Sequence, residues 1–203
     1  LVYCWGYFDG TRRRLAMFGA QMVGFATAMF GLVAADNFLL MYVFWEITSL
    51  LSYLLVSYYA ERASSRRAAQ QALMVTALGG LTMLMGIILL GRQTGAWTFS
   101  DISAYENFAQ TPYVTVAIVL ILAGALTKSA IAPAHFWLPG AMAAPTPVSA
   151  YLHSAAMVKA GIYLVARLAP SMYEVATWHV VVISLGVFTM LLGGWMALKQ
   201  RDL

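Results

Sequence analysis

Four ionisable side chains of this sequence fall inside long apolar stretches: Glu46, Lys128, His153 and Lys159. On membrane-insertion scales, a charge at the centre of an apolar span costs about 2.5–3.5 kcal/mol. Groups kept at that cost must pair, be hydrated or exchange protons. A carboxylate, two amines and an imidazole are suited to passing a proton along a chain of groups. These residue types therefore predict proton transfer inside a membrane.

Glu46 lies near the middle of a helix predicted over residues 38–59. At about 100° per residue, Glu46 shares one face with a set of hydroxyl groups. These belong to Tyr42, Ser49, Tyr53 and Ser57. The polar stripe favours a carboxylate that faces other helices through water or hydroxyls. The alternative is a static glutamate held in an ion pair.

Lys128 precedes a proline-rich stretch, within a helix predicted over residues 113–132. Pro133 and Pro139 lack a backbone donor and clash with the preceding turn, so the helix should break near 128–133. The negative pole of a broken helix favours a cation, and irregular backbone in lipid often builds ion sites. A lysine held between burial and a carboxylate can lose and regain a proton at modest cost. The alternative is a lysine that extends to the membrane interface.

Lys159 lies near the centre of a helix predicted over residues 148–168, among small residues that admit water and neighbouring helices. His153 lies six residues earlier, about 120° around an α-helix, so both could border one hydrated path. A hydrogen-bonded packing histidine is the alternative for His153. His135, inside the proline-rich break, is equally open between a proton-transfer role and a packing role.

Six apolar stretches position these residues, and each reaches the length of about 20 residues that spans a membrane. They cover roughly 15–35, 38–59, 68–90, 113–132, 148–168 and 178–198. Only 10% of the residues are charged, too few for a soluble chain to cover its surface. Strands with unpaired edges cannot sit in lipid, so we expect a single all-α transmembrane bundle with one broken helix. The outer connection, 92–112, is predicted to hold a short interfacial helix capped by Ser100, or else an irregular loop.

Lys and Arg are distributed unevenly about a chain that crosses six times. One side collects Arg12, Arg13, Arg14, Arg62, Arg66, Arg67, Lys199 and Arg201. The other side collects Arg92 and Arg167, with Asp36, Asp101, Glu106 and Glu174. The positive-inside rule makes the first side, and both ends of this chain, cytoplasmic in a multi-pass cell-membrane protein surrounded by lipid. The net charge of +4 thus follows from topology and indicates no nucleic-acid partner.

Other chemistry finds no support in the sequence. Cys4 is the single cysteine, and there is no metal-ligand spacing, nucleotide fingerprint or nucleophile–base arrangement. We therefore expect no catalytic residue, metal or cofactor. The chain also lacks an initiating Met and opens in an aromatic stretch, which suggests part of a longer protein.

Several motifs resemble one known family. Residues 36–50, DNFLLMYVFWEITSL, resemble the glutamate-bearing helix of the antiporter-like subunits shared by respiratory complex I and Mrp-type cation/proton antiporters. TKSA at 127–130, HFWLP at 135–139 and AMAAPTPVSA at 141–150 resemble the broken helix of that family. YLHSAAMVKAG at 151–161 is most similar to the large A-type chain of Mrp antiporters, because we expect a small or neutral residue at position 159 in the complex I counterpart.

The resemblance implies a switching ion pair between Glu46 and Lys128, with Lys159 and His153 continuing a proton path. It also implies that the spans are the fourth to ninth of a longer subunit within a hetero-oligomeric complex, so that this part alone should not transport. Three functions stay open: a subunit that exchanges Na⁺ or another monovalent cation for protons, a proton-pumping complex I subunit, or a scaffold whose buried charges fix helix register.

Overall fold

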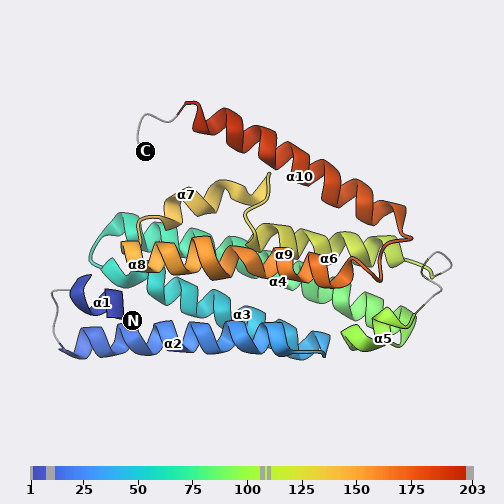
Figure 1. The fold of residues 1–203 in the computed structure, drawn as a ribbon, viewed down its shortest axis with the longest axis horizontal. Coiled ribbons are helices and arrows are strands. Elements are labelled where there is room, and N and C mark those ends of the chain that lie inside the picture. Colours follow the sequence, from blue (N-terminus) through green and yellow to red (C-terminus); the bar gives the residue numbers. More distant parts are fainter. Residues whose placement is uncertain (1, 8–11, 106–107, 109–110, 200–203) are drawn as a thin grey trace.

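The computed structural model describes residues 2–7, 12–105, 108 and 111–199, which form a helix bundle (Figure 1). A short helix α1 (Val2–Tyr7) precedes the bundle. The main helices are α2 (Arg12–Ala34), α3 (Phe38–Val56), α4 (Ala63–Thr94), α6 (Val114–Lys128), α9 (Met157–Leu168) and α10 (Ala176–Ala197). In the described ranges the extended backbone amounts to one isolated bridge between Asn37 and Thr98. The all-α fold class is confirmed.

Five segments are long and apolar enough to cross a membrane. They are Arg13–Ala34, Phe38–Tyr59, Ala63–Thr94, Thr146–Leu168 and Ala176–Ala197. The remaining predicted span is the shorter apolar helix Val114–Lys128. It is followed by the 3₁₀ turn η3 (Ala134–Phe136) and the short helix α7 (Trp137–Ala141), so the fourth span is broken where the prolines predicted. Another 3₁₀ turn, η1 (Ser57–Tyr59), ends the second span.

Local chemistry sets the ends of these helices. Asn37 caps α3, because its Oδ1 accepts hydrogen bonds from the backbone N–H groups of Leu39 and Leu40. α4 ends at Gly95, whose φ of 73° is the left-handed conformation that glycine adopts most easily. Beyond α6, Ala130 has a φ of 53°, which turns the chain away from the helix axis.

The connection between the third and fourth spans contains a short helix. α5 spans Phe99–Ser103, and its N-cap is Thr98, whose Oγ1 accepts from the N–H of Asp101 at 3.0 Å. The cap expected at Ser100 is therefore wrong, since Thr98 has the extended backbone that an N-cap needs. Residues 106–107, Glu106 included, and Arg201 lie outside the described residues.

The bundle has two ends, named here by a residue of each. At the Arg14 end, Arg14 pairs with Glu61 at 3.4 Å and lies over the ring of Tyr58. At the Asp36 end, Asp36 pairs with Arg167 at 3.2 Å. Each ion pair joins two residues that are separated along the chain by whole spans but lie at the same end of the bundle. The predicted back-and-forth topology requires this arrangement.

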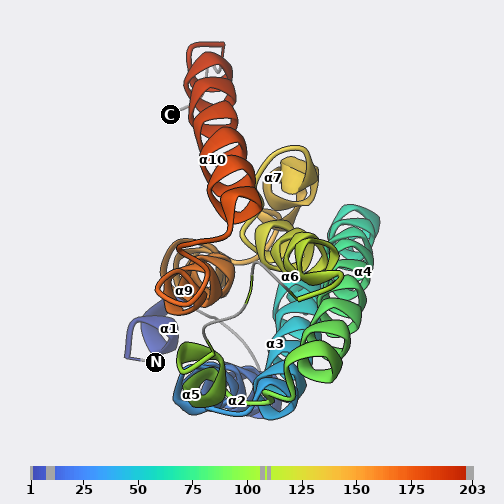
Figure 2. The ribbon, with the colours of Figure 1, turned by 90° about the vertical axis from the view of Figure 1, so that its right-hand side faces the viewer.

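Close packing is concentrated where α4 crosses α6. A Cβ atom on Gly86 would lie 2.7 Å from the carbonyl oxygen of Ala117, and one on Gly124 would overlap the carbonyl of Gly79. Small residues therefore let these two backbones touch. α10 is different: Trp178 is its buried residue, and Figure 2 shows the helix leaving the rest of the bundle.

Candidate functional site

The ammonium of Lys128 is the most completely buried charge among the described residues. Lys128 stands in the last turn of α6 and is 0% exposed. Its Nζ donates to the carbonyl of Trp45 at 2.7 Å, to Thr48 Oγ1 at 2.6 Å and to Ser49 Oγ at 3.0 Å. Nζ also lies 4.5 Å from the centre of the Trp45 ring. One turn of α3 thus supplies three acceptors and an aromatic face, and the lysine does not extend to an interface.

Glu46 follows Trp45 on the same turn of α3 and lies between α3 and α4. Its side chain is half-buried, and Oε1 is buried without a hydrogen-bond partner among the described residues. Tyr42 and Lys128 are the groups that act electrostatically on this carboxylate. Of the described residues, only Arg14 with Glu61 and Arg167 with Asp36 are close enough to count as ion pairs. A direct Glu46–Lys128 pair is therefore absent from this arrangement, although both groups meet the same turn.

Several buried polar side-chain atoms have no hydrogen-bond partner among the described residues. Over the described ranges they belong to Trp45, Glu46, His135 and His153. Buried polar groups are nearly always hydrogen-bonded, so each exception calls for an explanation, and a role in catalysis or proton transfer is one. Three of these residues were predicted from sequence as proton-transfer groups.

His153 lies in a π-helical segment that the sequence did not reveal. The fifth span is composed of α8 (Thr146–Ser149), the π-helix η4 (Ala150–Ala156) and α9. Pro145 stands at the N-cap position and Thr146 is the first residue of α8, so this span begins two residues before the predicted 148. A π-turn bonds residue i to i+5, so the angle of 120° expected between His153 and Lys159 does not apply.

The His153 ring is 6% exposed, and neither ring nitrogen has a hydrogen-bond partner in the described part of the chain. Its ring centre lies 6.2 Å from that of Trp137 on α7. Trp137 Nε1 donates in turn to the carbonyl of Thr127, the residue before Lys128. Trp137 therefore joins the helix break to both the histidine and the end of α6.

The residues of the break itself lie as follows. Pro133 follows the turn at Ala130, and His135 lies in η3 with a buried, unpaired Nδ1. Pro139 was expected in irregular backbone but lies in the first turn of α7, where a helix needs no N–H donor. A hydrogen bond from the N–H of Ala132 to Thr189 Oγ1, at 3.0 Å, ties the break to α10.

Lys159 is not brought to this group. Its side chain is exposed on α9, and in the described residues it takes part in no hydrogen bond or ion pair. Among the described residues it is bonded to neither Glu46 nor Lys128, and its place in the proton path stays a prediction. The small residues near it admit a neighbouring helix, as expected: a Cβ on Gly161 would overlap the carbonyl of Ala125, so α9 touches α6 there.

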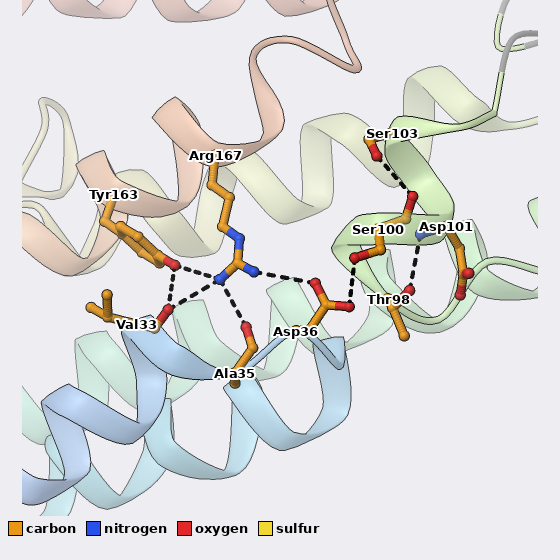
Figure 3. A network of polar contacts seen from close by, with 9 residues as sticks. All are labelled: Val33, Ala35, Asp36, Thr98, Ser100, Asp101, Ser103, Tyr163 and Arg167. Carbon is orange, nitrogen blue, oxygen red and sulfur yellow. Dashed lines mark hydrogen bonds and ion pairs between the residues drawn. The ribbon is translucent and has the colours of Figure 1, made fainter.

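A second polar cluster, at the Asp36 end, was not predicted. Figure 3 shows the Arg167 guanidinium reaching from α9 to the end of α2, where it donates to the carbonyls of Val33 and Ala35 at 3.1 and 2.8 Å. It also pairs with Asp36, which accepts a hydrogen bond from Ser100 of α5 at 2.9 Å. The predicted topology put Arg167 and Asp36 on the same side of the membrane. That shared side was the one indication in the sequence that the two residues could pair.

Comparison with known proteins gives the family of the chain. Residues 35–203 match the family described as NADH:quinone oxidoreductase/Mrp antiporter, TM. The chain is 46% identical to the A-type subunit of the Na(+)/H(+) antiporter of Alkalihalophilus pseudofirmus, over 100% of this chain and 25% of that protein. It is 43% identical to the A/B-type subunit of a probable K(+)/H(+) antiporter of Rhizobium meliloti, over 97% of this chain and 20% of that protein. The chain thus spans about a quarter or less of the length of these relatives.

Two solved structures share the fold. One is a chain of the Mrp complex from Dietzia sp. DQ12-45-1b, with a TM-score of 0.84 and 41% identity over 90% of this chain and 20% of that chain. The other belongs to the membrane-bound sulfane sulfur reductase, an archaeal respiratory membrane complex, with a TM-score of 0.81 and 25% identity over 90% and 38% of the two chains. The chain is therefore a multi-pass membrane protein of the family shared by NADH:quinone oxidoreductase and Mrp antiporters, and it resembles the A-type antiporter subunits within that family.

Proposed function

We propose that this chain forms the proton-translocating part of a subunit that exchanges a monovalent cation for protons. Glu46 and Lys128 are its central proton-transfer groups. The observation that carries the proposal is the fully buried ammonium of Lys128, held by the turn of α3 that bears Glu46 with its unpaired Oε1. A switch needs two groups that can pair and separate. Here the ammonium is held by acceptors of α3, while Glu46 Oε1 lies against Gly80 of α4, so each group has a position apart from the other.

His153 and His135 extend this proposal toward the helix break. Both carry unpaired buried nitrogens, and His153 contacts Trp137, which is bonded to the end of α6. Imidazoles change charge near neutral pH, so they can accept and release protons there. In the proposed relay, His153 exchanges protons after Lys128, and His135 continues the path into the helix break.

Lys159 takes a later position in the proposed relay. A lysine exposed on the middle of a membrane helix is costly in lipid, whereas a neighbouring protein segment or water would accommodate it. We propose that Lys159 meets such a segment, in the same protein or in another membrane subunit of the complex. The path then continues outward from α9.

The relatives favour an antiporter over a redox-driven pump. The matched curated proteins are named as cation/proton antiporter subunits, and the matched Mrp chain is more similar in sequence than the reductase chain, at 41% against 25% identity. We propose Na⁺ or another monovalent cation as the exchanged ion, and the cell membrane as the location with both chain ends on the cytoplasmic side. A complex I-type pump is the alternative, and co-purification with iron–sulfur subunits would favour it.

The proposal is tested in the complete complex, reconstituted in vesicles with a pH-sensitive dye. Glu46→Gln and Lys128→Met should each lower cation-dependent proton exchange by about 100-fold or more, the usual contribution of a positioned acid or base. Glu61→Gln and Lys199→Met change the same charges at exposed positions and should exchange normally.

Co-purification of the partner subunits serves as the assembly control. Normal exchange by both Glu46→Gln and Lys128→Met would overturn the relay. Loss of assembly in both would favour the scaffold, in which the charges only fix helix register.

A further inference from the structure

Gly80 of α4 lies directly against the Glu46 carboxylate. A Cβ atom at position 80 would overlap Glu46 Oε1 and would lie 3.2 Å from Glu46 Cδ. It would also lie 3.6 Å from Cδ1 of Trp45. The carboxylate oxygen thus occupies the volume that any side chain at position 80 would fill.

The identity of the neighbouring atom separates Gly80 from the packing glycines. At Gly86, Gly124 and Gly161, an added Cβ meets backbone atoms of another helix, which cannot move without moving that helix. At Gly80 it meets the end of a flexible side chain, which can rotate away. A methyl group there would displace the carboxylate and leave the helices in place.

Other groups act on the carboxyl group, but none of the described residues bonds to this oxygen. Oε1 is buried and has no hydrogen-bond partner among the described residues. The groups that act on the carboxylate are Tyr42, one turn earlier on α3, and Lys128 from α6. On the side of the carboxylate that faces α4, the neighbouring residue is Gly80, which presents only its backbone.

We propose that Gly80 is a positioning residue, whose missing side chain provides the space in which the Glu46 carboxylate rests beside Lys128. The inference builds on the proposed role of Glu46 and adds α4 to the elements that set its geometry. Any larger residue at position 80 changes the separation of the two charges without removing either of them.

The first experiment compares Gly→Ala substitutions in the complete complex. Gly80→Ala should assemble normally and lower the exchange rate by about 10- to 100-fold, because displacements near 1 Å cost that much in proximity-dependent steps. Gly19→Ala has open space and should exchange normally. In Gly86→Ala the added methyl group would meet the backbone of α6. This variant shows the effect of packing damage alone, measured as a loss of assembly or of thermal stability.

Shortening Glu46 supplies a rescue that a packing role would not show. Glu46→Asp withdraws the carboxylate from α4, so Gly80→Ala should cost less than about twofold in that background, a coupling expected of groups in contact. If Gly80→Ala cost the same in the Glu46→Asp background as in the unchanged protein, the proposal would be overturned. Normal exchange by Gly80→Ala alone would overturn it too.

Infrared spectroscopy gives a reading that does not require exchange activity. The carboxyl and carboxylate bands lost in Glu46→Gln should shift in Gly80→Ala but not in Gly19→Ala. Unshifted bands would overturn the positioning role even if Glu46→Asp proved inactive. Normal exchange by Glu46→Gln would instead defeat the proposed function, while the band shift would still test the contact between Gly80 and Glu46.

Discussion

At the scale of single residues, the charge of Lys128 depends on one turn of α3. An ammonium has three N–H donors, and each finds an acceptor: the Trp45 carbonyl, Thr48 Oγ1 and Ser49 Oγ. Both hydroxyls also bond to the Trp45 carbonyl, at 2.7 and 3.2 Å. The charge is therefore satisfied without the carboxylate, which leaves Glu46 free to act as a separate group.

Thr48→Val tests this arrangement, because valine has nearly the shape of threonine but no acceptor. The buried ammonium loses one hydrogen bond to a charged group, worth about 1.5–3 kcal/mol. We expect the unfolding free energy of the complex to fall by that order and the exchange rate to fall with it, measured by thermal unfolding and by vesicle assay.

Thr82→Val is the matched control. Within the described part of the chain, the Thr82 hydroxyl bonds to the Leu78 carbonyl of its own helix alone, at a less buried position. If Thr48→Val behaved like Thr82→Val in both assays, the Thr48 oxygen would have no part in holding the ammonium.

The sequence made the charged members of this site predictable and its neutral members much less so. Glu46 and Lys128 stand out because charges in apolar spans are costly. Thr48 does not, because a helical threonine ordinarily bonds to the carbonyl of its own helix, as this one also does. The Trp45 acceptor is a backbone carbonyl and Gly80 has no side chain, so only the packed structure shows that both belong to the site.

At the scale of elements, chain breaks were predictable where proline dictates them. The end of α6 at Lys128 followed from Pro133, whose ring excludes a continuous helix. The π-helix Ala150–Ala156 was not predictable, since no residue in it forbids ordinary α-helical bonding. The ring of His153 is placed by its packing against Trp137 instead.

The Arg167 cluster connects α9 to the end of α2 and to α5 at the Asp36 end. Its guanidinium stabilises carbonyls at the α2 C-terminus, where the helix leaves them without partners, and stacks on the Phe99 ring at 4.0 Å. Arg167→Gln should therefore lower the unfolding free energy of the complex by about 1–3 kcal/mol, since it leaves those carbonyls poorly satisfied.

Asp36→Asn should cost less, at most about 1 kcal/mol, because partly exposed ion pairs contribute little and the carbonyl contacts of Arg167 persist. Arg92→Gln, an exposed cation on α4, is the control for loss of charge. Thermal unfolding of the purified complex ranks the variants. Equal losses from Arg167→Gln and Arg92→Gln would show that the cluster does not hold the helices together.

At the scale of the whole molecule, the described helices present surfaces that suit a larger assembly. α10 buries little beyond Trp178, and the Lys159 side chain is exposed on α9. The relatives are about four times longer, so other segments exist in them to meet such surfaces. The positions of the spans were predictable from hydropathy, whereas these outward faces were not.

The sidedness of the chain gives the last prediction. Arg13 and Arg14 begin α2, and Arg66 and Arg67 lie in the first turns of α4 near the same end, whereas Glu174 follows α9 toward the other. Basic residues stay on the cytoplasmic side during insertion. In a complex otherwise free of cysteine, Ser64→Cys should therefore react with a membrane-impermeant thiol reagent only in inverted vesicles, and Glu174→Cys only in intact cells.

Both positions are exposed, so burial within this chain does not block the reagent. The helices α4, α6 and α9 lie between the two positions, and an odd number of crossings puts them on opposite sides. Labelling of both from one side would mean an even number of crossings, which would require that α6 and the break after it return to the side from which α6 began. The assignment of the Arg14 end to the cytoplasmic side and of the Asp36 end to the opposite side would then be wrong.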